Sequence, residues 1–122
     1  MAPGRAWQVV FYEDLRGRCP AREFLASLPT KDRAKVAAWI DLLEEKGPRL
    51  GRPYVAKLEA GIYELRVRVS TLRYRILYFF WTGQRIVLTH GFVKKRGPVP
   101  ASEIERAKRY RQDWLERYGG EE

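Results

Sequence analysis

Cysteine and histidine each occur once in this 122-residue chain, as Cys19 and His90. A single cysteine excludes an intrachain disulfide and a metal cage of thiolates. We expect no metal ion and no other cofactor. No uncharged apolar run approaches the roughly 18 residues of a membrane span, and residues 1–7 lack the hydrophobic core of a signal peptide. These absences predict a cytoplasmic protein that does not enter a membrane.

Acidic residues are scarce in one part of the chain. Residues 62–100 hold eight basic residues and one acidic residue, and the net charge of the whole chain is +9. A field of this sign attracts polyanions and raises the rate of association with nucleic acid. The alternative is that these charges only keep one side of a sheet soluble.

The length and the hydrophobic pattern predict one α+β domain that covers residues 1–122. We expect an antiparallel sheet, an N-terminal helical hairpin and a C-terminal helix, in the order β-α-α-β-β-β-α. The expected elements are a strand at 7–12, a helix from Pro20 to just before Pro29, a helix at 31–46, strands at 62–69, 73–81 and 85–93, and a helix from Ser102 to just before Gly119. Residues 49–60 contain Gly51 and Pro53 and are interpreted as a connection across the surface.

Alternation along the strands gathers positive charge on one side of the sheet. Successive residues of a strand point to opposite faces, so Arg66 and Arg68 share one face and can stand opposite Arg73 and Arg75 of the next strand. Like charges across a sheet repel each other, which indicates that such a cluster exists to meet an anion. The basic run after the last strand extends this cluster: Lys94, Lys95 and Arg96.

Two stretches of the sequence carry a family resemblance. YELRVRVSTLRYRILYFF (63–80) and IVLTHGFVKKRGPVPASEIERAKRYRQDWL (86–115) resemble the phage-derived, HigB-like branch of the RelE/ParE toxins. The resemblance implies a RelE-like microbial ribonuclease fold and a toxin of a type II toxin-antitoxin system that cleaves mRNA in the ribosomal A site. It also implies a cognate antitoxin as partner, which we expect to be a helix-turn-helix protein encoded by the adjacent gene.

The resemblance also implies roles for individual residues. Catalysis is expected from Arg66, Arg75, Lys94 and Lys95, with Arg68 and Arg73 as helpers and Arg96 as a further RNA contact. Cleavage would proceed by attack of a ribose 2′-hydroxyl on the adjacent phosphate, which requires a base, an acid and positive charge on the phosphorane. Arginine suits the charge-stabilising role, whereas a lysine among arginines can carry a proton.

The base and the acid have further candidates. Glu64 is on the arginine side of its strand, where it could act as a base or simply reduce repulsion between the arginines. His90 could carry a proton or be a buried structural histidine on the same strand as Leu88 and Phe92. Tyr74 and Trp81 are candidates for stacking on an RNA base.

Two other classes of function fit the same charges. The first is a ParE-like poison of a topoisomerase, which would share the fold and carry no nuclease chemistry. The second is a module that binds RNA or the ribosome without cutting, for which no proton carrier is needed.

Overall fold

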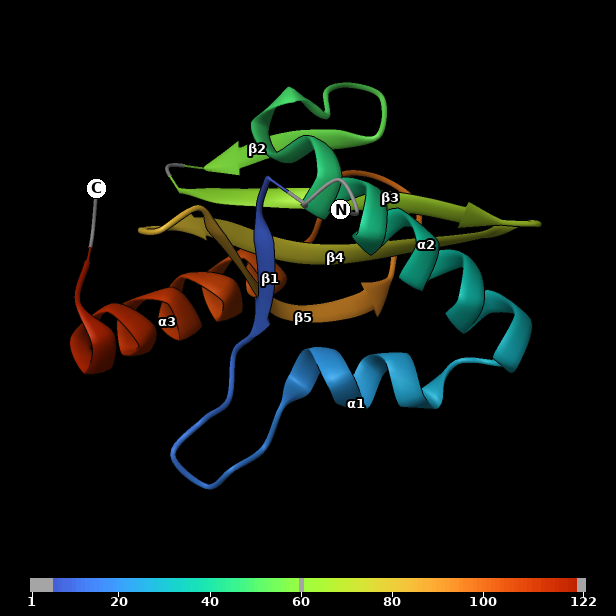
Figure 1. Cartoon of the computed structure of the whole chain (residues 1–122). Helices are drawn as coiled ribbons and strands as arrows, with labels where there is room; N and C mark the ends of the chain where they lie inside the picture. Colours follow the sequence, from blue (N-terminus) through green and yellow to red (C-terminus); the bar gives the residue numbers. More distant parts are fainter. Residues whose placement is uncertain (1–5, 60, 121–122) are drawn as a thin grey trace.

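A computed structural model describes residues 6–59 and 61–120 (Figure 1). Its elements are β1 (Gln8–Phe11), α1 (Pro20–Ser27), α2 (Thr30–Lys46), the 3-10 turn η1 (Gly47–Arg49), β2 (Val55–Glu59), β3 (Ile62–Val69), β4 (Leu72–Trp81), β5 (Arg85–Val93) and α3 (Ala101–Tyr118). The predicted α+β class is confirmed, and the predicted limits of β3 and β5 agree with the structure.

The five strands form one mixed sheet in the order β1-β5-β4-β3-β2. Two expectations about this sheet are wrong. Residues 55–59 are an edge strand that pairs with β3, and not part of a connection across the surface. β1 runs parallel to β5, so the sheet is not purely antiparallel. Both short strands depend on their pairing: β2 pairs with the next strand of the chain, β3, whereas β1 pairs with the distant β5.

The helix limits follow local signals with small shifts. Pro20 opens α1, as is favourable for a residue without an amide hydrogen, and α2 ends at Lys46, followed by Gly47 with a φ of 55°. The N-terminal end of α3 lies at Ala101 after Pro100, and no side chain caps it. Ser102 therefore lies inside the first turn and does not start the helix as predicted.

Helices cover both faces of the sheet, with α1 and α2 on one face and α3 on the other. The alternate residues Leu65, Val67, Tyr74, Ile76 and Tyr78 face α1 and α2 and form a core with them. The opposite residues of the same sheet, such as Ile62, Leu77 and Phe79, pack against Ala107 and Trp114 of α3. The arginine side is thus not a fully solvent-facing surface, because α3 buries part of it.

The pairing of β4 with β5 contains a bulge. Leu77 lies opposite His90 and Tyr78 opposite Leu88, so Thr89 is an extra residue on β5. On the far side of the bulge Gly91 lies so close to the Phe24 ring of α1 that a Cβ there would come within 2.3 Å of it. This close contact seats α1 against β5.

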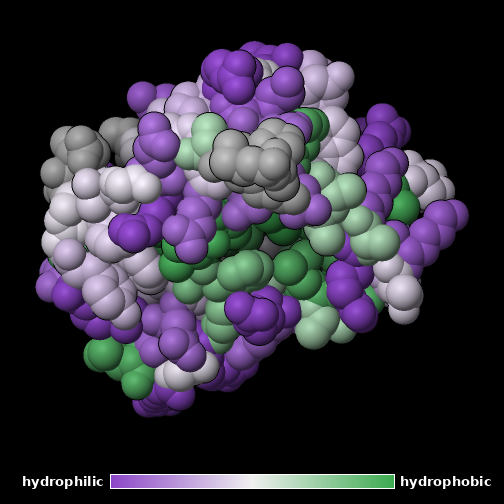
Figure 2. Space-filling model, in the orientation of Figure 1, coloured by the Kyte–Doolittle hydropathy of each residue, from purple (hydrophilic) through white to green (hydrophobic). Residues whose placement is uncertain are grey.

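The surface shown in Figure 2 is mainly hydrophilic, with hydrophobic side chains gathered near β1 between α1 and α2. A shallow pocket lies there, and its lining includes Val9, Phe11, Leu25 and Ile40. None of the helices in the described part of the chain is both long and apolar enough to cross a bilayer.

Candidate functional site

Five basic side chains meet on the α3 side of the sheet, beyond the part that α3 covers. Arg66 of β3 lies opposite Arg75 of β4, and Arg68 lies opposite Arg73. Lys94, the residue that follows β5, continues the second row, because its amide donates a hydrogen bond to the Arg73 carbonyl. We call these residues the basic cluster: Arg66, Arg68, Arg73, Arg75 and Lys94. The structure thus brings together most of the predicted catalytic and RNA-binding cations.

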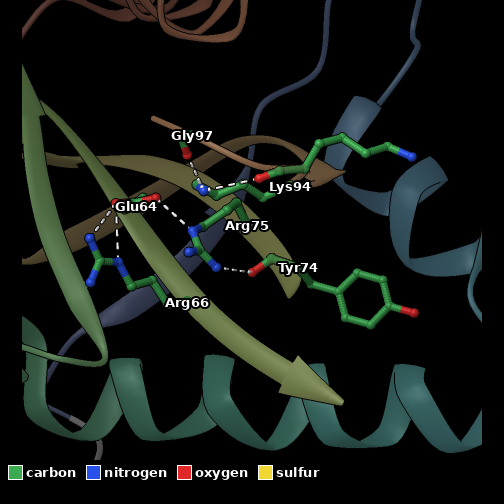
Figure 3. A network of polar contacts seen from close by, with 7 residues as sticks. Glu64, Arg66, Tyr74, Arg75, Lys94 and Gly97 are labelled. Carbon is green, nitrogen blue, oxygen red and sulfur yellow. Dashed lines mark hydrogen bonds and ion pairs between the residues drawn. The ribbon is translucent and has the colours of Figure 1, made fainter. Parts of the chain in front are cut away.

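Glu64 lies at one end of the basic cluster, opposite Leu77 of β4 and next to the row of Arg66 and Arg75, and is only 2% exposed. Its Oε1 lies 2.8 Å from Nε of Arg75, and its Oε2 lies 3.1 Å from Nη2 of Arg66 (Figure 3). Nε of Arg66 also donates a hydrogen bond to Oε2, over 3.2 Å. One carboxylate therefore holds two guanidinium groups side by side and offsets the repulsion between them.

Arg75 is buried, in contrast to Arg68 and Arg73 on the same side of the sheet. It is 9% exposed, and its Nη1 donates a hydrogen bond to the carbonyl of Tyr74. Burial lowers the pKa of the guanidinium, and the charge of Glu64 opposes that shift. The position is buried because Glu64, Arg66 and the neighbouring strand surround it, which alternation along β4 alone does not reveal.

The residues after β5 form the rim of the site. Nζ of Lys94 donates hydrogen bonds to the carbonyls of Lys95 and Gly97, so this amine braces the turn beside the basic cluster (Figure 3). Lys95 and Arg96 are exposed at this rim.

His90 has a structural environment. It is 1% exposed, its Nε2 lies 2.9 Å from Oε1 of Glu103 on α3, and its Nδ1 lies 3.1 Å from Oγ1 of Thr89. Burial lowers the pKa of the imidazole to about 4, although the hydrogen bond with Glu103 opposes this shift. The geometry favours a role in docking α3 on the sheet over the predicted role in catalysis.

We expect the stability of the protein to decrease as the pH is lowered, because of His90. Its pKa in the folded chain, about 4, lies below the ordinary value of 6.5. The unfolded chain therefore takes up the proton first, and the contribution of neutral His90 is complete above pH 6.5 and is lost as the pH falls toward 4. Urea unfolding should show a loss of about 2 kcal/mol between pH ~7.5 and pH ~5. His90→Gln should remove this part of the pH dependence, and curves of equal slope for the two proteins would contradict the prediction.

Tyr74 is not available for stacking on RNA, so this prediction is wrong. The side chain is 2% exposed and lies on the α1 and α2 side of the sheet, where its ring packs edge-on against Phe24. Its hydroxyl donates a hydrogen bond to the buried carboxylate of Asp32, over 2.5 Å. Trp81 lies at the other end of β4 and donates a hydrogen bond to the Gly119 carbonyl, which ties it to the end of α3.

A groove that the sequence did not predict opens beside the basic cluster. Its volume is about 430 Å³, and Lys35 and Trp39 of α2 and Tyr54 before β2 line it together with the arginines. Trp39 has the helical spacing of a core residue, and Tyr54 lies in the segment interpreted as a connection. Tyr54, an aromatic residue in a segment with Gly51 and Pro53, is the one signal in the sequence that could have indicated this groove.

The fold and the site define a small α+β protein whose mixed sheet carries arginines around a buried carboxylate. The family model of phage-derived Gp49-like proteins matches residues 23–112, which include the whole basic cluster. The chain belongs to this family, a toxin-like family of the RelE/HigB type. A search of curated proteins finds no match.

Proposed function

We propose that the protein is the toxin of a type II toxin-antitoxin system and acts as an endoribonuclease on mRNA in the ribosomal A site, without a metal ion. The observation that carries this proposal is the pair of guanidinium groups of Arg66 and Arg75, held by the buried Glu64 on an accessible side of the sheet. Family membership supports the toxin class. It also supports a cognate antitoxin as partner.

The arrangement suits stabilisation of a phosphorane. A guanidinium is planar, always charged and able to bind two phosphate oxygens, so two of them held in place need little reorganisation during the reaction. Arg66 has a side chain that is 32% exposed, which allows contact with a phosphate. In this proposal Arg66 and Arg75 supply the positive charge that a metal ion supplies in other nucleases.

The proton transfers are assigned to the lysine pair Lys94 and Lys95. Glu64 has both carboxylate oxygens engaged by guanidinium groups and is almost fully buried, so its role is to position the arginines. A lysine amine at the rim can take the proton of the 2′-hydroxyl or give one to the leaving oxygen. Separate alanine variants of the two lysines identify which amine reacts, since only that variant should lose cleavage at saturating substrate.

The test is to incubate the protein with translating ribosomes and to map the ends of the mRNA. Cuts that require ribosomes support the proposal, whereas cuts in naked RNA indicate a free ribonuclease. Intact mRNA with blocked translation indicates a binding module, and intact mRNA with inhibited gyrase indicates a topoisomerase poison. Either of these last two results overturns the proposed chemistry.

Arg68 and Arg73 are expected to contribute to binding alone. Both are exposed and lie one row further from Glu64 than Arg66 and Arg75. Changing either to alanine removes a phosphate contact, so affinity for every single-stranded sequence should fall, and the slope of log K against log salt should decrease by about 0.7. Cleavage at saturation should stay near the wild-type rate. A variant that binds normally but cuts slowly would place that arginine among the catalytic residues.

A further inference from the structure

The sheet has an open edge next to the basic cluster. Pairing of β2 with β3 ends at Val55 opposite Leu65, followed by one hydrogen bond from the Arg66 amide to the Tyr54 carbonyl. None of the described strands pairs with residues 67–69 on that side. The groove beside this edge has lining residues from both faces of the sheet, because Arg66 and Arg68 point to one face and Val67 to the other. A chain bound to the arginines can therefore continue around the edge toward α2.

An exposed aromatic face lies in this groove. The rings of Trp39 and Tyr54 stack, with centroids 4.9 Å apart and planes at 30°. Tyr54 is 45% exposed although it is a large aromatic residue, and its ring stacks on Trp39. A ring that is supported on one face and open on the other is a platform on which a planar group can stack.

Positive charge surrounds this platform. Lys35 lies one turn before Trp39 on α2 and is exposed, and Arg66 and Arg68 approach from β3. The described side chains that line the groove are basic, aromatic or apolar, and none is acidic. The volume of about 430 Å³ falls in the range of sites that bind small molecules, roughly 300–1,000 Å³.

We propose that this groove binds an unpaired RNA base next to the scissile phosphate, with the base stacked on Tyr54 and the flanking phosphate held by Lys35 and Arg68. This inference rests on the proposed function and assigns part of its specificity: the substrate must be single-stranded around the cut, because a paired base is not free to stack. Stacking tolerates every base, so the groove selects unpaired RNA and not a particular sequence.

The combination of features favours RNA over an acidic peptide. An acidic segment of a protein partner would use the cations and leave the stacked aromatic face without a role. A nucleotide uses both, since its base meets the ring while its phosphate meets the lysine and arginine. The groove is also continuous with the two guanidinium groups held by Glu64, which places it along the path of the same strand.

The experiment uses the full chain and a single-stranded oligonucleotide with 2′-O-methyl riboses and one 2-aminopurine. The probe cannot be cut by 2′-hydroxyl attack, and stacking on an aromatic ring quenches its fluorescence. The wild-type protein should quench the single strand and leave a duplex of the same sequence unchanged. Tyr54→Ala should abolish quenching and weaken binding about tenfold, whereas Tyr54→Phe should keep both.

Two further variants make the test specific. Lys35→Ala is a change on the exposed side of α2 and should weaken binding and lower the salt slope by about 0.7 while quenching at saturation remains. Tyr118→Ala is the matched control, because Tyr118 is 54% exposed at the far end of α3, and it should bind as the wild type does. Thermal unfolding of each variant confirms that it is folded.

The outcomes separate this inference from the proposed function. Normal quenching and affinity in a folded Tyr54→Ala protein, or a wild-type protein that does not quench the single strand, overturns the inference, whatever the cleavage assay gives. A Tyr54→Ala protein that binds RNA normally but no longer binds the antitoxin assigns the groove to the protein partner and also overturns it. If Tyr54→Ala loses quenching while Arg75 and Lys95 variants cut normally, the groove stands and the assigned nuclease site fails.

Discussion

Arg75→Lys is expected to lower the rate of mRNA cleavage at saturating substrate about 100-fold, with little loss of binding. The charge is retained, but lysine presents one ammonium group where arginine presents a rigid fork. The fork is needed because Nε of Arg75 faces Glu64 and Nη1 donates to the Tyr74 carbonyl, so the guanidinium is fixed by groups on two sides. Single-turnover cleavage on programmed ribosomes measures this rate.

Arg85→Lys provides the control for this change. Arg85 is another strand arginine and is half-buried, and it lies at the start of β5 over the ring of Trp81, away from the basic cluster. The Arg85→Lys protein should cleave mRNA as fast as the wild type. Lysine is preferred to alanine at position 75 because alanine would leave the buried Glu64 with one partner fewer and confound activity with stability. A folded Arg75→Lys protein that cuts at the normal rate would remove Arg75 from the proposed mechanism.

Glu64→Gln is expected to lower the free energy of unfolding by about 3 kcal/mol and to reduce cleavage. The amide keeps the shape of the carboxylate but not its charge, so the buried guanidinium of Arg75 and its neighbour Arg66 lose the anion between them. Urea unfolding at neutral pH measures the loss. Glu59→Gln is the control, because Glu59 pairs with Lys108 on the surface and its loss should change stability little.

A double-mutant cycle tests whether this effect comes from the ion pair. Arg75→Met should cost much stability in the wild-type background and clearly less in the Glu64→Gln background, because no unpaired buried charge remains. Additive losses would show that Glu64 and Arg75 act independently. In that case the positioning role assigned to Glu64 would have to be withdrawn.

The sequence predicted where most strands and helices lie better than it predicted which strands pair with each other. The alternation in residues 62–69 and 85–93 identified β3 and β5, because a strand with one apolar side leaves a period of two. Residues 55–59 were missed because Gly51 and Pro53 break the pattern just before a strand of five residues. The parallel contact between β1 and β5 joins segments far apart in the chain, and no local pattern encodes such a partner.

The sequence predicted which charged residues form the candidate site but not which of them are buried. Alternation correctly placed Glu64, Arg66 and Arg75 on one side of the sheet, yet it could not tell how that side is covered. The structure buries Glu64 and Arg75 and leaves Arg68 and Arg73 exposed. Burial depends on the ion pairs of Glu64 with Arg66 and Arg75 and on the pairing of β4 with β5, which are contacts between strands.

The bulge at Thr89 divides β5 into two halves of opposite parity. Before it, Val87 faces α3 and Leu88 faces the other core, whereas after it His90 and Phe92 face α3. A regular strand would have turned Thr89, Gly91 and Val93 toward the arginines, and Phe24 of α1 would then meet a side chain in place of Gly91. The single extra residue thus reverses which residues of β5 face each side of the sheet. The first half of the strand contributes to the core, and the second half leads into the charged site.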